Sequence, residues 1–210
     1  MTEKAQEPEL DAAEVVALGE QGFFVRDRWL GAHVAARVHA EIEELAKAGR
    51  LHRAGLSRGA QHRLDPSQRG DEVAWIEPHG QAASSALSAL CERFELLRRA
   101  LNRTAWLGLD RFDVQAARYP GGGTHYARHR DAFSDRPSRR VTAIYYANPG
   151  WGAAAGGLLR LHSTDRPTDI APQDDRLVVF LSERIEHEVT PAQAPRIAVT
   201  AWYYGATAPR

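Results

Sequence analysis

Cysteine and lysine are nearly absent from this sequence of 210 residues. It contains one cysteine, Cys91, and two lysines against 25 arginines. A single thiol cannot form an internal disulfide, so a fold held together by disulfides is excluded. Cys91 lies between Leu90 and Phe94 in an amphipathic stretch, where we expect the thiol to pack in the core as a small apolar group.

An excess of charge of either sign is also absent. The chain has 27 basic and 27 acidic residues, which removes the attraction to phosphate that non-specific nucleic-acid binding requires, so we expect no nucleic-acid partner. It has no apolar run of the about 20 residues that span a bilayer. The start, MTEKAQEPELDAAE, lacks the basic head and apolar core of a secretory signal. We expect a cytoplasmic chain without a membrane partner, disordered over residues 1–10.

Helical periodicity characterises the first half of the chain. One helix is predicted by Val34, Val38, Ile42 and Leu45, with Gly49 as its C-terminal cap. A second has its apolar positions at Leu87, Leu90, Phe94, Leu97 and Leu101. The polar segment between them, residues 57–71, predicts a long loop that is either a mobile lid or a solvated connector. Residues 11–105 are therefore expected to support the site.

After Asp110 the hydrophobic period changes from helical to alternating. The segments RFDVQAARY, VTAIYY and RIAVTAWYY each place small aliphatic side chains on one face. The opposite, polar or aromatic faces hold Asp113, Gln115, Tyr119, Thr142, Tyr146, Arg196, Thr200 and Trp202. Residues 106–205 thus predict an antiparallel sandwich or barrel with a polar interior. The expected class is α+β, mainly β with supporting helices.

Three side chains suggest a metal site. His129 and Asp131 are two residues apart, so on an extended strand both leave the same face and can bind one ion. A lone HxD motif in an arginine-rich segment is more often a surface feature. His187, at the start of a later predicted strand, would complete the two-His, one-carboxylate triad that holds Fe(II) and leaves coordination positions open.

Arg196 adds a second element to this site. A turn around Pro191 and Pro195 predicts a hairpin that brings the guanidinium back near the His187 strand. There it could hold a carboxylate through two hydrogen bonds, and 2-oxoglutarate has the length to reach from such a clamp to the metal. Tyr119 and Tyr146 could donate hydroxyl hydrogen bonds to the same molecule, although each could equally be a core aromatic.

The glycine run at residues 120–123, PGGG, predicts a tight turn with positive φ that directs the following strand into the site. No helix signature or GK[ST] follows it, so a phosphate-binding loop is not indicated. His125 and His162 have no convergent partner and are expected not to bind metal. Trp151 and the glycine pair at 156–157 predict a bend between strands.

These motifs together resemble a known enzyme family. The runs RGDEVAWIE, RYPGGGTHYARHRD, RRVTAIYYANPGW, GGLLRLH, DRLVVFLSERIEHEVTPA and PRIAVTAWYYG look like the Fe(II)- and 2-oxoglutarate-dependent prolyl 4-hydroxylases, in the EGL-nine branch that includes the hypoxia-inducible-factor prolyl hydroxylases and bacterial relatives. The resemblance covers about residues 69–205, in order.

The resemblance implies one domain over residues 1–210. Its core would be a double-stranded β-helix, or jelly roll, of two four-stranded sheets, with the N-terminal helices packed on the major sheet. It also implies that His129, Asp131 and His187 bind Fe(II) and that Arg196 and Tyr146 hold the distal carboxylate of 2-oxoglutarate. Tyr119 would contact the cosubstrate near the metal, and Thr200 and Trp202 would line the same pocket.

The expected activity is hydroxylation of a prolyl residue in a protein, with O2 consumed, succinate and CO2 released, and ascorbate as a candidate reductant. The resemblance to bacterial members suggests a translation component as the substrate of a monomeric enzyme. Two alternatives stay open. One keeps the iron site but hydroxylates a free amino acid or small metabolite, and the other is a non-catalytic metal-binding β-sandwich that acts as a sensor.

Overall fold

The structure is a computed structural model that describes residues 10–55, 65, 68–78, 80, 85–132, 139–163 and 166–205. Most of the predicted 57–71 loop and residues 1–9 of the predicted disordered start lie outside these ranges. Leu10, the one described residue of that start, is buried in the apolar cluster beside the helices, so the expectation of disorder is wrong for Leu10 itself. Within the described ranges, no helix is long and apolar enough to cross a membrane.

The two predicted helices and the predicted strands after Asp110 are present. The helices are α1 (Ala12–Glu20), α2 (Ala32–Lys47) and α3 (Ala86–Ala105), with a short 3-10 helix, η2 (Ala153–Ala155). The early strands are β1 (Phe23–Asp27), β2 (His52–Arg53) and β3 (Glu72–Ile76). The later strands are β4 (Leu109–Tyr119), β5 (Thr124–Arg130), β6 (Arg139–Tyr146), β7 (Leu159–His162), β8 (Thr168–Ile170), β9 (Arg176–Leu181), β10 (Glu186–Ala192) and β11 (Arg196–Gly205). Of these elements, α1, β1 and β2 were not predicted.

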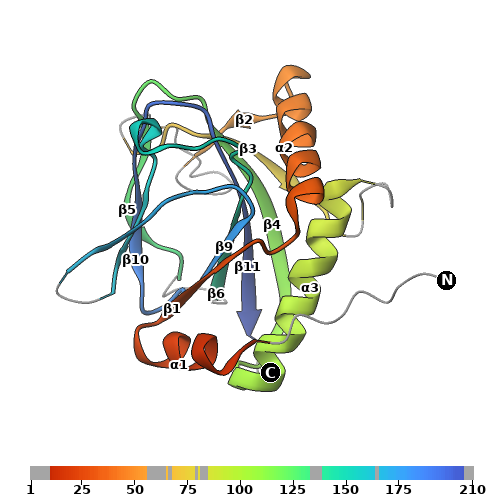
Figure 1. Ribbon diagram of the computed structural model, residues 1–210, viewed down its shortest axis with the longest axis vertical. Coiled ribbons are helices and arrows are strands. Elements are labelled where there is room, and N and C mark those ends of the chain that lie inside the picture. The colour runs from red at the N-terminus through yellow and green to blue at the C-terminus, as the bar shows by residue number, and fades with distance from the viewer. Residues whose placement is uncertain are drawn as a thin grey trace.

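Two antiparallel sheets face each other (Figure 1). The major sheet has the order β1-β9-β6-β11-β4-β3-β2, and the minor sheet has the order β5-β10-β7-β8. The jelly-roll class is therefore correct, and the expected core of two four-stranded sheets is present as β9-β6-β11-β4 and β5-β10-β7-β8; within the described residues, three further strands extend the major sheet to seven. The extra strands β1, β2 and β3 come from residues 11–105, so that region extends the sheet as well as supporting it.

α2 and α3 lie side by side on the outer face of the major sheet, whereas α1 lies at one end of the molecule beside β1 (Figure 1). The predicted apolar positions of α3 are buried there against the aliphatic alternates of β11. Ser85 caps α3 by accepting a hydrogen bond from the Ser88 N–H at 3.0 Å, and Gly49 follows α2 with φ +66°. Burying each such Leu or Phe contributes about 1.5–3 kcal/mol, so this layer fixes the sheet on which the site is built.

The inner face of the major sheet carries the polar alternates. Thr200 of β11 is paired with Gln115 of β4 and with Ile144 of β6, and Arg196 is paired with Tyr119. Because cross-strand partners point to the same side, these side chains face the minor sheet. The prediction of a polar interior is confirmed, and a smaller apolar cluster that includes Tyr146, Leu159 and Phe180 closes the space between the sheets beside it.

Candidate metal centre and cosubstrate pocket

A cleft of about 910 Å³ lies between the two sheets. Of the eight predicted site residues, seven line it: Tyr119, His129, Asp131, His187, Arg196, Thr200 and Trp202. The eighth, Tyr146, is fully buried behind the wall of the cleft, where the Arg196 guanidinium lies 4.9 Å from its ring centroid. The sequence therefore identified a set of side chains that the fold brings together from five strands and one strand end.

His129, Asp131 and His187 converge on one point of this cleft. One donor atom from each lies within 4.8 Å of the others. The Nε2 atoms of His129 and His187 are each 3.8 Å from a different carboxylate oxygen of Asp131. The two histidines are direct cross-strand partners on β5 and β10, and Asp131 follows the end of β5. Among the described residues, this is the one such group of potential metal ligands.

Both imidazoles have the neutral protonation state that metal binding requires. Burial lowers the pKa of His187 to about 3, and burial also lowers the pKa of His129, with Asp131 opposing the shift in each case. Both rings are therefore neutral at physiological pH and offer a lone pair. His129 Nδ1 lies 2.9 Å from the Ala127 carbonyl oxygen, which can only accept a hydrogen bond, so Nδ1 carries the hydrogen and Nε2 is left unprotonated and directed at Asp131.

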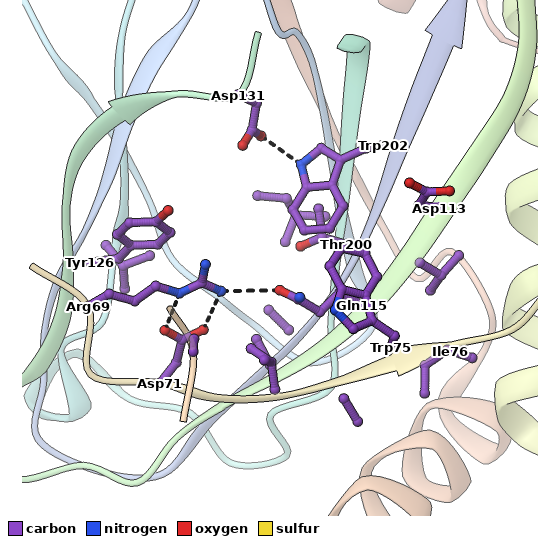
Figure 2. A pocket seen from close by; sticks show the side chains of 18 of the residues that line it. Arg69, Asp71, Trp75, Ile76, Asp113, Gln115, Tyr126, Asp131, Thr200 and Trp202 are labelled. Atoms are coloured by element: carbon purple, nitrogen blue, oxygen red, sulfur yellow. Dashed lines mark hydrogen bonds and ion pairs between the residues drawn. The ribbon is translucent and has the colours of Figure 1, made fainter. Parts of the chain in front are cut away.

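Asp131 is held as a carboxylate by three neighbours. Thr142 Oγ1 and Trp202 Nε1 donate to its Oδ2 at 2.8 and 2.9 Å, and Arg139 lies 3.3 Å from its Oδ1 (Figure 2). Burial raises the pKa of Asp131, but the imidazoles of His187 and His129 and the Arg139 guanidinium outweigh burial and hold the pKa at about 2. Trp202 thus does more than line the pocket, because its indole N–H fixes the orientation of the carboxylate.

Arg196 is a buried cation at the other end of the cleft. It is 3% exposed, and among the described residues it has no acidic partner. Its guanidinium lies between the rings of Tyr119 and Tyr146, 4.8 and 4.9 Å from their centroids, and its Nε donates to the Gly157 carbonyl at 2.8 Å. A buried charge without a counterion is costly, so this geometry favours binding of an anion.

The two tyrosines next to Arg196 are hydrogen-bond donors. Burial raises the pKa of both, against the opposing charge of Arg196, so both hydroxyls stay protonated. The Tyr146 hydroxyl is buried and has no hydrogen-bond partner among the described residues. A carboxylate gripped by the guanidinium would provide the acceptor that this hydroxyl lacks.

Arg196 reaches this position by a route that differs from the predicted hairpin. β10 belongs to the minor sheet and β11 to the major sheet, so the turn at Pro191–Pro195 crosses between the sheets and does not pair the two strands. The polypeptide can cross here because glycines of two neighbouring segments, residues 121–123 and 156–157, leave room for its backbone. A Cβ on Gly121 would lie 2.9 Å from the Gln193 carbonyl oxygen, and the Gly123 N–H donates to Ala192 O at 2.8 Å.

This crossing also explains the glycine-rich stretch. The tight turn with positive φ is confirmed at Gly121, Gly122 and Gly123. Besides directing the next strand, the glycine turn packs directly against the backbone of the β10–β11 turn. The predicted bend at the glycine pair 156–157 packs against the same turn. Trp151 Nε1 donates a hydrogen bond to Gly156 O within this bend at 3.1 Å.

Sequence reasoning missed a network on the β3 and β4 side of the cleft. Arg69 binds Asp71 through two hydrogen bonds of 2.6 and 2.9 Å and lies 4.5 Å above the Tyr126 ring, which stacks on His129 with centroids 3.8 Å apart (Figure 2). Strict alternation from His129 would turn Tyr126 to the outside. A register irregularity between the His187 and Val189 pairings rotates it inward.

A family model and a set of relatives match this chain. The 2OG-Fe(II) oxygenase superfamily model matches residues 114–204, which hold all eight predicted site residues. Human prolyl hydroxylase EGLN3 is 35% identical over 199 residues, and the match covers 91% of this chain and 82% of the relative. The chain belongs to the EGL-nine branch of this superfamily. Mouse Egl nine homolog 1 is 33% identical over 199 residues, and the chain spans about half the length of that relative, 49%.

Solved structures agree with this family. A prolyl-4-hydroxylase of Pseudomonas putida is 36% identical with a TM-score of 0.82, and the match covers 92% of this chain and 98% of that one. A Trichoplax adhaerens prolyl hydroxylase, in complex with a hypoxia inducible factor oxygen degradation domain peptide fragment, is 32% identical with a TM-score of 0.82, covering 91% and 87%. The fold of this chain is thus shared with two solved prolyl hydroxylases.

Proposed function

We propose that this protein is an Fe(II)- and 2-oxoglutarate-dependent dioxygenase that hydroxylates a prolyl residue in a protein substrate and releases succinate and CO2. The single observation that carries this proposal is the pairing of two features in one cleft. A group of two histidines and one aspartate shares the cleft with a buried arginine that has no acidic partner among the described residues. A sensor that only binds metal has no use for the arginine, whereas a keto-diacid cosubstrate needs both.

The donor set fits ferrous iron. His129, Asp131 and His187 would supply two neutral nitrogens and one carboxylate oxygen, which is the facial set of non-haem Fe(II) oxygenases and leaves coordination positions open. Thr142 and Trp202 hold the carboxylate in place from behind. Such a site discriminates poorly among divalent ions by affinity alone, so Mn(II) is a suitable redox-stable probe of it.

The arginine and its neighbours fit 2-oxoglutarate. Arg196 and the Tyr146 hydroxyl would bind the distal carboxylate, and Tyr119 would donate to the cosubstrate closer to the metal. Thr200, in the row of side chains between Arg196 and Trp202 on β11, would line the same pocket. The half-apolar walls keep bulk water away from these polar contacts, which strengthens them.

When bound, iron and 2-oxoglutarate together activate O2, so that one oxygen atom enters succinate as CO2 leaves and the other enters the C–H bond of the substrate. The residues of this chain bind and orient the reactants. Asp131 stays ionised, the two imidazoles stay neutral, and the tyrosines near Arg196 stay protonated. No residue of the site has to change its protonation state for the metal or the cosubstrate to bind.

Succinate formation from 2-oxoglutarate tests the assignment of the site. The purified protein with Fe(II) and ascorbate should form succinate, and Asp131→Ala and His187→Ala should not. Asp169→Ala and His162→Ala are matched controls, because these side chains lie on the outer face of the minor sheet and interact with Arg160 and Glu188. Full turnover by Asp131→Ala would refute the ligand assignment.

The substrate is tested separately by mass spectrometry. We expect a gain of one oxygen on proline in a protein target, found by comparing hydroxyproline across the proteome with and without the gene. Oxidation of a free amino acid in place of a peptide would favour the small-metabolite alternative, and metal binding without 2-oxoglutarate consumption would favour the sensor. A translation component as the substrate is a prediction that the proteome comparison addresses. Ascorbate as the reductant, a cytoplasmic location and a monomeric state stay predictions.

A further inference from the structure

One polar side chain in the cleft is used neither by the metal ligands nor by the arginine clamp. Gln115 lies in the middle of β4, paired with Trp75 of β3 on one side and with Thr200 of β11 on the other. All three line the cleft, and Figure 2 shows Gln115 between Arg69 and the tryptophan–threonine side of the pocket. Gln115 is 6% exposed, so its carboxamide lies inside the cleft and not on the outer surface.

The orientation of this carboxamide is fixed by Arg69. Arg69 Nη2 lies 3.1 Å from Gln115 Oε1, and a guanidinium can only donate, so the oxygen end of the amide must face the arginine. Arg69 is itself held by its two hydrogen bonds to Asp71, which is 2% exposed. The NH2 end of Gln115 is therefore directed away from this ion pair.

That NH2 group has no acceptor within the described part of the chain. Its hydrogen bond with Arg69 is the one polar contact of Gln115 among these residues. A donor enclosed by protein needs a partner from water or from a ligand. Trp75, beside it, is 45% exposed, whereas Arg196 is 3% exposed, so Gln115 belongs to the open end of the cleft where a large substrate enters.

We propose that Gln115 donates a hydrogen bond from its carboxamide N–H to a main-chain carbonyl oxygen of the substrate polypeptide and is thereby a specificity-determining residue. This inference rests on the proposed function, prolyl hydroxylation of a protein. A prolyl residue has no backbone N–H, so the enzyme can grip its main chain only by donating to carbonyl oxygens. Gln115 lines this cleft with such a donor, which Arg69 orients and which has no acceptor among the described residues.

The test uses two substitutions that separate the donor from the contact with Arg69. Gln115→Met keeps the length of the side chain and removes both polar atoms. Gln115→Glu keeps an acceptor for Arg69 and replaces the N–H donor by a second carboxylate oxygen, with a negative charge that lies beside the Arg69 guanidinium. Gln21→Met is the control, because Gln21 is an exposed glutamine that follows α1, outside the cleft. The probe is the peptide that the wild type hydroxylates fastest among short peptides with a central proline.

Both variants should raise the KM for this peptide about tenfold, the effect of one lost hydrogen bond. The KM for 2-oxoglutarate and the affinity for Mn(II) should be unchanged in both, and Gln21→Met should match the wild type in every measurement. Thermal melting checks that each variant is folded. If Gln115→Met does not fold, Gln115→Glu alone decides the matter by the same two KM values.

Three results would overturn the inference. The first is an unchanged peptide KM in a folded Gln115→Met or Gln115→Glu. The second is a normal peptide KM in Gln115→Glu with a raised one in Gln115→Met, since the side chain would then only support Arg69. The third is a rise confined to the KM for 2-oxoglutarate, which would assign Gln115 to the cosubstrate. If the wild type consumes 2-oxoglutarate but hydroxylates no peptide, the proposed function fails first and the inference falls with it.

Discussion

Replacing Gly157 by alanine should damage the 2-oxoglutarate clamp without touching the metal. A Cβ on Gly157 would lie 2.8 Å from Arg196 Cδ and 3.1 Å from Ala192 Cβ. Arg196 Cδ would have to retreat by about 0.7 Å to reach normal van der Waals separation. Gly157 also has φ +67°, where a side chain costs about 1–2 kcal/mol, and its carbonyl oxygen anchors Arg196 Nε. Both effects displace the guanidinium.

The expected loss of affinity for 2-oxoglutarate follows from the strength of the hydrogen bond between its carboxylate and the displaced Arg196 guanidinium. A hydrogen bond to a charged group contributes about 1.5–3 kcal/mol, so the Kd for 2-oxoglutarate should rise about 10- to 150-fold. The backbone strain should lower Tm by about 2–8 °C. Calorimetric titration of Mn(II)-loaded protein with 2-oxoglutarate measures the first quantity, and a thermal melt measures the second. The affinity for Mn(II) itself should not change.

Gly152→Ala is the matched control for this experiment. Gly152 has φ −131° and no atom within 4 Å of the Cβ position, so the same substitution should alter neither the affinity for 2-oxoglutarate nor the stability by more than about 0.5 kcal/mol. If Gly157→Ala binds 2-oxoglutarate as tightly as the wild type, Arg196 does not hold the cosubstrate in the way the structure indicates.

Three further substitutions test the rest of the site. Asp131→Asn should abolish tight Mn(II) binding, because it removes the charge between the two imidazoles, and titration calorimetry will show this. Thr142→Val keeps the shape of the side chain but removes the hydroxyl that donates to Asp131, and should weaken Mn(II) binding about 10- to 100-fold; an unchanged affinity would contradict a role in orienting the carboxylate. Tyr146→Phe should raise the Kd for 2-oxoglutarate about tenfold, yet leave the Tm of the free protein unchanged or higher, because the hydroxyl it removes is buried without a partner. A fall in Tm would mean that the hydroxyl stabilises the protein before the cosubstrate binds.

Site residues that belong to the same strand could be predicted from the sequence, because their positions depend only on the two-residue repeat of a strand. Side chains on a strand alternate, so His129 and Asp131 had to share a face, as did Arg196, Thr200 and Trp202. The pairing of His129 with His187 is a contact between distant segments, and no local pattern specifies it. The resemblance to a family provided that part of the prediction.

Features that depend on exceptions to these periods could not be predicted. The irregularity in β5 that turns Tyr126 toward His129 breaks the alternation that a regular strand would show. The Pro191–Pro195 turn has the composition of a hairpin turn, and only the contacts on either side of it decide that it crosses to the other sheet. Likewise, β1 and β3 join the major sheet through pairings with β9 and β4 that lie far away along the chain.

The crossing turn between β10 and β11 fixes how far apart two parts of the site lie. His187 and Arg196 belong to opposite walls of the molecule, and the short connection between them is clamped by glycines on both flanks. The spacing from the metal ligands to the guanidinium is therefore set by the packing of this turn together with the contacts that hold the Arg196 side chain. We therefore expect dicarboxylic keto acids one carbon shorter or longer than 2-oxoglutarate to fit less well between the metal ligands and Arg196. The fold itself would then select the chain length of the cosubstrate.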